Sequence, residues 1–305
     1  MKLPILKELK YLSPTSLGEW TRCEMLFYLK RLSVHPYVSS PQTNPAAIGT
    51  MFDILVKLAI AQAIDYPVTE DFTLDALIKK NIEPQCEGIA VQAGNRLFAE
   101  YVRNGCLKRL IDEGVQYIEL TKKEALLHAE EEVVFLGLPD LMMKDGRLIE
   151  LKVSGAASVN GASPCPGYKT YFTSGINQGA HEKFREPLDK LNPGWAEQLT
   201  IYSWLYNNPF PLRPIPVGVE QLCVSKAGKI ICTSIRTTVS TEFQLLIWKR
   251  AVDAWQRARD GEITDAQPSE ERCHKWGQVC EVADKCEAYQ KWKTSEHPFD
   301  ELMRR

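Results

Sequence analysis

The sequence predicts an α/β protein. Two short apolar runs flank Asp145-Gly146, a dipeptide typical of tight turns between antiparallel strands. Longer stretches before and after these runs repeat apolar residues at three- and four-residue intervals, as amphipathic helices do. The predicted order is helices, mixed strands, a helix, strands, a helix and a tail that contains cysteines. We therefore expect one domain over residues 1–305, with its core over 45–240.

The first predicted helix spans 13–32, because Ser13 is a favoured N-cap residue and apolar residues follow it at helical spacing. A proline-rich loop separates this helix from a second one over 48–64. Helical patterns recur in four later segments: 73–80, 88–113, 195–206 and 241–259. Strands are predicted from about residue 130 onward, in a hairpin over 137–153 and in a second hairpin over 217–235.

A long loop is predicted over 155–193, where Gly, Ser, Asn and Pro are abundant. A loop of this length inside a compact domain is usually functional or disordered. Tyr168, Tyr171 and Phe172 lie within it. If the protein binds nucleic acid, these aromatic side chains are candidates for stacking on bases.

Composition limits the range of functions. The 305 residues carry a net charge of −2, so any contact with nucleic acid must come from a local basic patch. No apolar run approaches the length of a membrane span, and the first residues lack the features of a signal peptide. We therefore expect a cytoplasmic protein that does not contact a membrane. In that compartment its nine cysteines should be thiols or metal ligands rather than disulfides.

The strongest catalytic candidates lie in the first hairpin. Asp140 precedes one strand and Glu150 lies in the other, so both carboxylates should meet at one end of the sheet. Carboxylate oxygens are the ligands that Mg²⁺ and Mn²⁺ prefer. Lys152 lies two residues after Glu150 and therefore on the same face of the strand. The alternative is that these charged side chains form an ordinary solvated face.

This arrangement resembles the core of the PD-(D/E)xK nuclease superfamily. In that superfamily a metal ion activates water for attack on a phosphodiester, and the lysine positions the water or stabilises the developing charge. The resemblance implies a restriction-endonuclease-like core, a central mixed sheet flanked by helices, and catalytic roles for Asp140, Glu150 and Lys152. It also implies that the backbone carbonyl of Leu151 is an extra metal ligand.

Two further motifs resemble the RecB-like members of the superfamily. Gly49 is followed four residues later by Asp53, where RecB-like nucleases have a metal-binding histidine; a carboxylate can serve the same purpose. The alternative for Asp53 is a solvated charge at a helix N-terminus. Gln198 and Tyr202 lie four residues apart on a predicted helix face. They match the Gln-x-x-x-Tyr motif that lines the active site in RecB-type nucleases.

Four cysteines resemble the ligands of the iron-sulfur subgroup, which includes AddB-type helicase-nucleases and CRISPR adaptation nucleases. Cys23 occupies the place of the early cysteine, and the other three follow near the end of the chain: Cys273, Cys280 and Cys286. The resemblance implies a 4Fe-4S cluster that joins residues 13–32 to 260–290 as a clasp. A structural Zn²⁺ on the same cysteines, or with His274 replacing one of them, is the alternative.

Together these features predict a metal-dependent deoxyribonuclease that acts on DNA ends or single strands, as an exonuclease in DNA repair or recombination. The chain has no Walker-type phosphate loop, so we expect any helicase activity to come from a helicase or recombination partner. The alternative is a noncatalytic DNA-binding or scaffold subunit that keeps the nuclease fold. Asp53 in place of histidine permits this alternative, whereas intact Asp140, Glu150 and Lys152 argue against it.

Overall fold

The computed structural model describes residues 2–34, 40–119, 121–154, 191–207, 213–224, 228–275 and 278–294. The chain divides into two compact units. The unit that we call the core unit consists of Pro41–Glu124 and Gly137–Leu246. The terminal unit consists of Met1–Ser40, Ala125–Leu136 and Ile247–Arg305. The prediction of a single domain over the whole chain stays a prediction.

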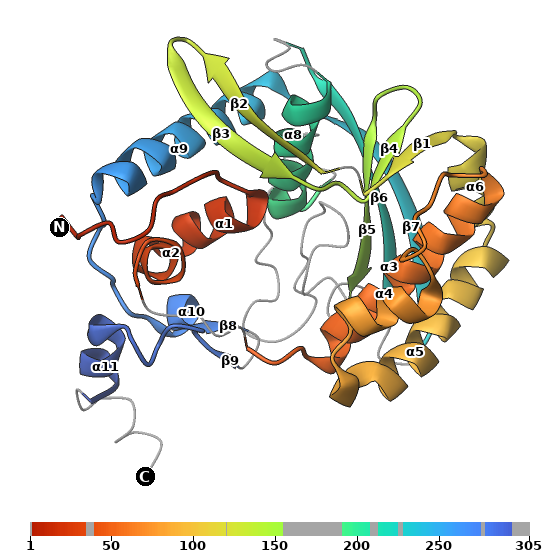
Figure 1. The fold of residues 1–305 in the computed structure, drawn as a ribbon, viewed down its shortest axis with the longest axis horizontal. Helices are drawn as coiled ribbons and strands as arrows, with labels where there is room; N and C mark the ends of the chain where they lie inside the picture. The colour runs from red at the N-terminus through yellow and green to blue at the C-terminus, as the bar shows by residue number, and fades with distance from the viewer. Residues whose placement is uncertain are drawn as a thin grey trace, which may run out of the picture. The chain divides into compact units, whose positions relative to one another are not determined.

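A mixed five-stranded sheet forms the centre of the core unit, with the strand order β1-β4-β5-β6-β7 (Figure 1). Strands β5 and β6 pair in parallel, and the other neighbouring strands pair antiparallel. The strands are β1 (Val115–Ile118), β4 (Leu141–Met143), β5 (Leu148–Ser154), β6 (Ile215–Val224) and β7 (Ile230–Val239). The sheet confirms the predicted α/β class and both predicted hairpins, β4–β5 and β6–β7.

The hairpin of β4 and β5 turns at the predicted Asp145-Gly146 dipeptide. Gly146 has a φ of 83°, a left-handed conformation that costs glycine little. Asp145 stabilises the turn, because its carboxylate accepts hydrogen bonds from the backbone N–H and the guanidinium of Arg147. Leu141 therefore faces Ile149 across the pair. This register places the residues just before β4 beside the middle of β5.

Helices cover both faces of the sheet. The first face is packed by α3 (Asn44–Ala63), α5 (Pro84–Arg103) and α6 (Cys106–Asp112), whose apolar residues join Ile149 and Leu151 in one buried core. The α4 helix (Leu74–Asn81) packs against α3. Side chains alternate along a strand, so Glu150 and Lys152 point to the other face. There α8 (Pro193–Tyr206) packs on β5 and β6.

The observed elements of the core unit differ from the predicted ones most clearly in two helical segments and one strand. The helix predicted over 88–113 is two helices, α5 and α6, because Gly105 between them has a φ of 69°. The α3 helix starts at Asn44, four residues earlier than predicted, and the side chain of Thr43 caps it. Strand β1 was not predicted, since its four residues show no clear alternation.

One helix among the described residues, α3, is long and apolar enough to cross a membrane. This helix differs from the expectation that no apolar run approaches the length of a membrane span. Of its most apolar stretch, 44% is buried inside the protein. A buried core helix passes the same test of length and composition, so a single such helix is weak evidence for a membrane span.

The terminal unit begins with α1 (Pro14–Arg22) and α2 (Glu24–Arg31), which correct the single helix predicted over 13–32. Cys23 separates them with extended backbone angles, φ −167° and ψ 115°. Ser13 caps α1 as predicted, because its side chain accepts a hydrogen bond from the N–H of Ser16. The break presents the Cys23 side chain at a helix junction rather than within a continuous helix.

The remainder of this unit consists of parts of two longer elements and the tail. Residues 125–136 belong to the hairpin of β2 (Lys122–His128) and β3 (Glu131–Gly137), and 247–260 belong to α9 (Thr241–Asp260). The tail forms α10 (Glu270–Cys273), β8 (His274–Lys275), β9 (Gln278–Val279) and α11 (Glu287–Thr294). Arg22 donates two hydrogen bonds to the carbonyl of Arg272, and Lys30 pairs with Glu281 at 2.8 Å. These contacts join the first helices to the tail.

Candidate active site

Asp140 and Glu150 lie side by side in the core unit. Asp140 follows β3 and immediately precedes β4, and its N–H donates to Oε1 of Glu150 at 3.3 Å. Oδ2 of Asp140 accepts a hydrogen bond of 2.8 Å from the N–H of Leu151. Glu150 is buried, with 2% of its surface exposed. The structure thus brings together the three predicted metal ligands of the hairpin.

Lys152 and Gln198 complete a network around Glu150. The ammonium of Lys152 donates to Glu150 Oε2 at 2.8 Å and to the side-chain oxygen of Gln198 at 3.1 Å. The amide of Gln198 donates in turn to Glu150 Oε2 and to the hydroxyl of Tyr202, both at 3.1 Å. The predicted pair on α8 therefore does face Glu150 and Lys152.

The close approach of α8 to this site requires Gly137. A Cβ atom at Gly137 would lie 2.5 Å from Cδ1 of Leu205 and 2.7 Å from Cδ1 of Tyr202, well inside van der Waals contact. The hydroxyl of Tyr206 also donates to the carbonyl of Gly137 at 3.4 Å. The absence of a side chain at this position lets the ring of Tyr202 lie against the chain that leads to Asp140.

Two charged residues of the site were missed by the sequence analysis. Lys57 lies one helical turn after Asp53 on α3 and pairs with Asp53 at 2.6 Å, with Glu119 at 2.8 Å and with Asp140 at 2.8 Å. A lysine inside an otherwise apolar helix, four residues after a candidate ligand, was a signal that could have identified it. Glu119 had no such signal, because it lies in the chain just after β1, where no periodic pattern marks a residue as part of a site.

The backbone at Glu119 is unusual. Its φ of 50° lies in the left-handed region, which is uncommon for residues other than glycine and is found preferentially at functional sites. The N–H of Glu119 donates to the carbonyl of Asp140 at 3.1 Å. These two features hold the carboxylate of Glu119 close to Asp140 and Lys57.

The pKa values of the acidic groups separate under burial and mutual repulsion. Burial, together with the neighbouring negative charge of Asp140, raises the pKa of Glu150 to about 8. Burial and the charge of Asp140 likewise raise the pKa of Asp53 to about 7. Burial also opposes ionisation of Asp140, but the positive charges of Lys57 and Lys152 outweigh it and lower its pKa. Burial raises the pKa of Tyr202 to about 12, so it remains a phenol at neutral pH.

The donor set suits a hard divalent cation. It consists of carboxylate oxygens and a backbone carbonyl, the ligands typical of Mg²⁺ and Mn²⁺. Oδ1 of Asp53 is buried and has no hydrogen-bond partner among the described residues, so this oxygen is left for a cation. Among the described residues, no three His, Cys, Asp or Glu side chains converge closely enough to hold a metal ion as they stand. At this site, three of the carboxylates are engaged by Lys57 instead.

The four predicted cysteine ligands lie around one cavity of the terminal unit. Cys23 comes from the junction of α1 and α2, and the other three come from the tail: Cys273, Cys280 and Cys286. The N–H of Cys280 donates to the carbonyl of Cys273 at 2.6 Å, which fixes two of them on one small hairpin. Burial raises the pKa values of the Cys280 and Cys286 thiols.

His274 does not line this cavity. Its ring packs against Tyr289 and Trp292, with centroid distances of 6.3 Å to each. The four thiols thus provide a soft donor set that fits a 4Fe-4S cluster or Zn²⁺, although in the described part of the chain they do not converge into metal-binding geometry as they stand.

Several predicted features fall outside the described residues. They include the aromatic residues of the long loop: Tyr168, Tyr171 and Phe172.

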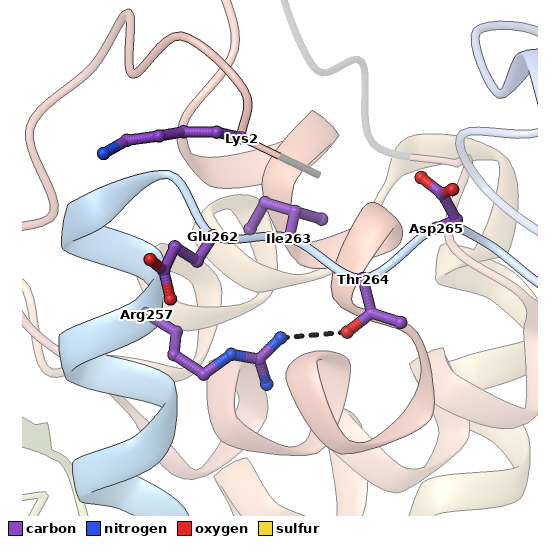
Figure 2. Close-up of a pocket in the computed structure, with 6 residues that line it drawn as sticks. All are labelled: Lys2, Arg257, Glu262, Ile263, Thr264 and Asp265. Carbon is purple, nitrogen blue, oxygen red and sulfur yellow. Dashed lines mark hydrogen bonds between the residues drawn. The ribbon is translucent and has the colours of Figure 1, made fainter.

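In the terminal unit, a surface cavity of about 540 Å³ is lined by Lys2, Arg257, Glu262, Ile263, Thr264 and Asp265 (Figure 2). Its guanidinium group, from Arg257, is already bound by Glu24 and Thr264. The cavity mixes both signs of charge and has no part in the carboxylate cluster.

The chain is an α/β protein with a mixed five-stranded sheet. Its fold is similar to that of a nuclease-like protein of known structure. That structure is the crystal structure of a protein from Eubacterium rectale named as a putative exonuclease. It has a TM-score of 0.55 and 12% sequence identity, and the match covers 95% of this chain and 90% of that one. At this identity the likeness shows a shared fold.

Other comparisons add little. The crystal structure of SSO0001 matches with a TM-score of 0.31 at 10% identity, over 90% of this chain and 93% of that one, which is too low to support an argument. No family model matches the chain, and no curated protein matches it.

Proposed function

We propose that this protein is a Mg²⁺- or Mn²⁺-dependent DNA nuclease of the RecB-like PD-(D/E)xK type that acts on DNA ends or single strands. The observation that carries the proposal is the hydrogen-bonded cluster of Asp140, Glu150, Lys152 and Gln198 beside β5. Two carboxylates, a lysine and a glutamine from separate segments converge there. The fold likeness to the Eubacterium rectale protein supports the same class.

The groups that would hold the divalent cation are Asp140, Glu150, Asp53 and the backbone carbonyl of Leu151. When bound, the cation would lower the pKa of a coordinated water and would neutralise charge that builds on the phosphate. Asp140 suits this role because its lowered pKa keeps it ionised at neutral pH. The unpartnered Oδ1 of Asp53 suits it because a buried oxygen without a donor is stabilised by a cation.

Lys152 is the proposed catalytic cation. Its ammonium is held by Glu150 and by Gln198, so the described residues occupy two of its three donors and leave one for water or a phosphate oxygen. Gln198 fixes the direction of this group, because its amide oxygen accepts from Lys152 while its nitrogen donates to Glu150. Tyr202 stays protonated and fixes the amide of Gln198 through its hydroxyl.

The direct test is digestion of end-labelled linear DNA and circular single-stranded DNA with Mg²⁺, Mn²⁺ or EDTA. We expect cleavage of the linear substrate that requires the divalent cation, and little cleavage of the circle. Glu150→Gln, which keeps the size of the side chain and removes its charge, is the matched negative control. Metal-dependent cleavage that persists in this variant would show a contaminating nuclease.

A noncatalytic DNA-binding or scaffold role is the second candidate. One observation favours it: Lys57 already compensates three of the carboxylates, as a resident cation would. DNA binding in EDTA, without cleavage under any of the metal conditions, would support this role. In either role a helicase or recombination partner would supply the strand separation that this chain does not encode.

For the terminal unit we propose a 4Fe-4S cluster bound by Cys23, Cys273, Cys280 and Cys286, with structural Zn²⁺ as the alternative. Its support is that all four cysteines line one cavity. Protein purified without oxygen should be brown and contain iron and acid-labile sulfide in equal amounts. Colourless protein with one zinc per chain would establish the alternative.

A further inference from the structure

The ammonium group of Lys57 is fixed among three carboxylates. Only 5% of its side-chain surface is exposed, and its neighbours Val56 and Ile60 on α3 are fully buried. A lysine at the surface could swing away from its partners, but a buried stem on a packed helix cannot. The positive charge of Lys57 therefore stays within the site.

Lys57 has no donor left for a substrate. A lysine ammonium has three N–H donors, and here they go to Asp53 at 2.6 Å, Glu119 at 2.8 Å and Asp140 at 2.8 Å. Lys152 differs, because its ammonium makes two hydrogen bonds to the side chains of Glu150 and Gln198. The two lysines thus have different roles, because all three donors of Lys57 bind carboxylates.

The charge balance of the site indicates the number of metal ions. In their ionised forms the four carboxylates, Asp53, Glu119, Asp140 and Glu150, contribute four negative charges. Lys57 and Lys152 contribute two positive charges, which leaves two negative charges to be compensated. Among the described residues, one divalent cation neutralises these charges, whereas two such cations would leave an excess of positive charge beside the buried Lys57 and Glu150.

We propose that Lys57 is a permanent cation in the place of a second divalent metal ion, so that this site binds a single Mg²⁺ or Mn²⁺. The inference rests on the proposed nuclease function. In two-metal phosphodiesterase sites the ions lie about 4 Å apart and share carboxylates. Here Asp53 and Asp140 would be shared in the same way, between the metal ion and Lys57. Lys57 is a positioning residue, since it contacts the ligands and leaves the substrate to other groups.

The test counts bound ions without using activity. Full-length protein is titrated with Mn²⁺, and free Mn²⁺ is measured by its electron paramagnetic resonance signal. The wild-type protein should bind one Mn²⁺ per chain at the site, and Lys57→Ala should bind two, because the second set of carboxylates becomes free. Lys108→Ala is the matched control: this lysine is exposed and pairs with Asp112, far from the site in the sequence, so its variant should bind one ion.

Two ions bound to the wild-type protein, or a single ion bound to folded Lys57→Ala, would overturn the inference. If Lys57→Ala does not fold, the count for the wild-type protein decides alone. The nuclease assay separates this failure from that of the proposed function. Two bound ions with metal-dependent cleavage would reject the role of Lys57 and keep the nuclease, whereas no bound ion and no cleavage would reject both.

Discussion

Lys57 and Glu119 are 62 residues apart in the sequence, yet Nζ of one lies 2.8 Å from Oε1 of the other. The lysine comes from the middle of α3, and the glutamate comes from the chain that leaves β1. Both also touch Asp140, through a salt bridge from Lys57 and a backbone hydrogen bond from Glu119. The site is therefore larger than the hairpin that holds Asp140 and Glu150.

Replacing Asp140 by asparagine should remove both activity and some stability. The variant loses one carboxylate ligand and the charge that pairs with Lys57, so metal-dependent cleavage should fall below detection. Loss of a charged hydrogen bond of this kind should lower the free energy of unfolding by about 2 kcal/mol. Urea denaturation followed by circular dichroism measures the second effect. Stability equal to that of the wild-type protein would contradict the observed pairing.

Replacing Lys152 by alanine should separate metal binding from turnover. Lys152 bonds to Glu150 but is not among the proposed metal ligands, so Mn²⁺ should still bind with an affinity within a few-fold of wild type. The cleavage rate should fall by about 10²- to 10³-fold, as expected for the loss of a group that stabilises developing charge. Calorimetric titration with Mn²⁺ and a single-turnover cleavage assay give the two values. Equal losses in both would assign Lys152 to metal binding.

Metal binding should strengthen as the pH rises from 6 to 8.5. The pKa values of Asp53 and Glu150, about 7 and about 8 without metal, lie above those of an unfolded chain, so the folded protein holds protons that the unfolded chain releases. The stability from these protons is complete below the unfolded pKa values and is lost as the pH passes 7 and 8.

A divalent cation replaces these protons, so it should bind more tightly and stabilise more at high pH. Thermal unfolding with and without 10 mM Mg²⁺, at pH 6 and at pH 8.5, measures the effect as a shift in Tm. We expect a shift on the order of a few degrees. The shift should be larger at pH 8.5. Equal shifts at the two pH values would show that Asp53 and Glu150 are already ionised at pH 6 without metal.

DNA binding should depend only modestly on salt. The net charge of −2 limits the number of phosphate contacts. With about five contacts to single-stranded DNA, the slope of log affinity against log salt should be about −3 to −4. Fluorescence anisotropy in EDTA, which prevents cleavage, measures this slope. A slope near −10 would require an extended basic surface and would contradict this expectation.

If the cysteine cavity binds the proposed cluster or zinc, replacing Cys23 by serine should remove that metal. We expect the visible absorbance and the bound iron to disappear, because the remaining three thiols leave a cluster with an open position. Cys106→Ser is the control, since this buried cysteine of the core unit belongs to a different hydrophobic cluster. Iron or zinc retained at wild-type levels by Cys23→Ser would show that Cys23 is not a ligand.

The sequence was sufficient to predict what depends on local pattern. The two apolar runs around Asp145-Gly146 predict the hairpin, and the two-residue period of its second strand places Lys152 beside Glu150. The four-residue spacing on a helix similarly places Gln198 and Tyr202 on one face. The metal ions and the substrate stay predictions, because no local pattern identifies them.

Only the tertiary structure decided which distant groups share the site. The local pattern set Lys57 apart only by its place four residues after Asp53, and it gave no signal for Glu119. The packed structure brings both residues to Asp140. The break at Cys23 lies where the local pattern predicts continuous helix, and only the structure shows its extended backbone angles. Contacts between residues far apart in sequence depend on how elements pack, and a residue's local pattern does not contain this information.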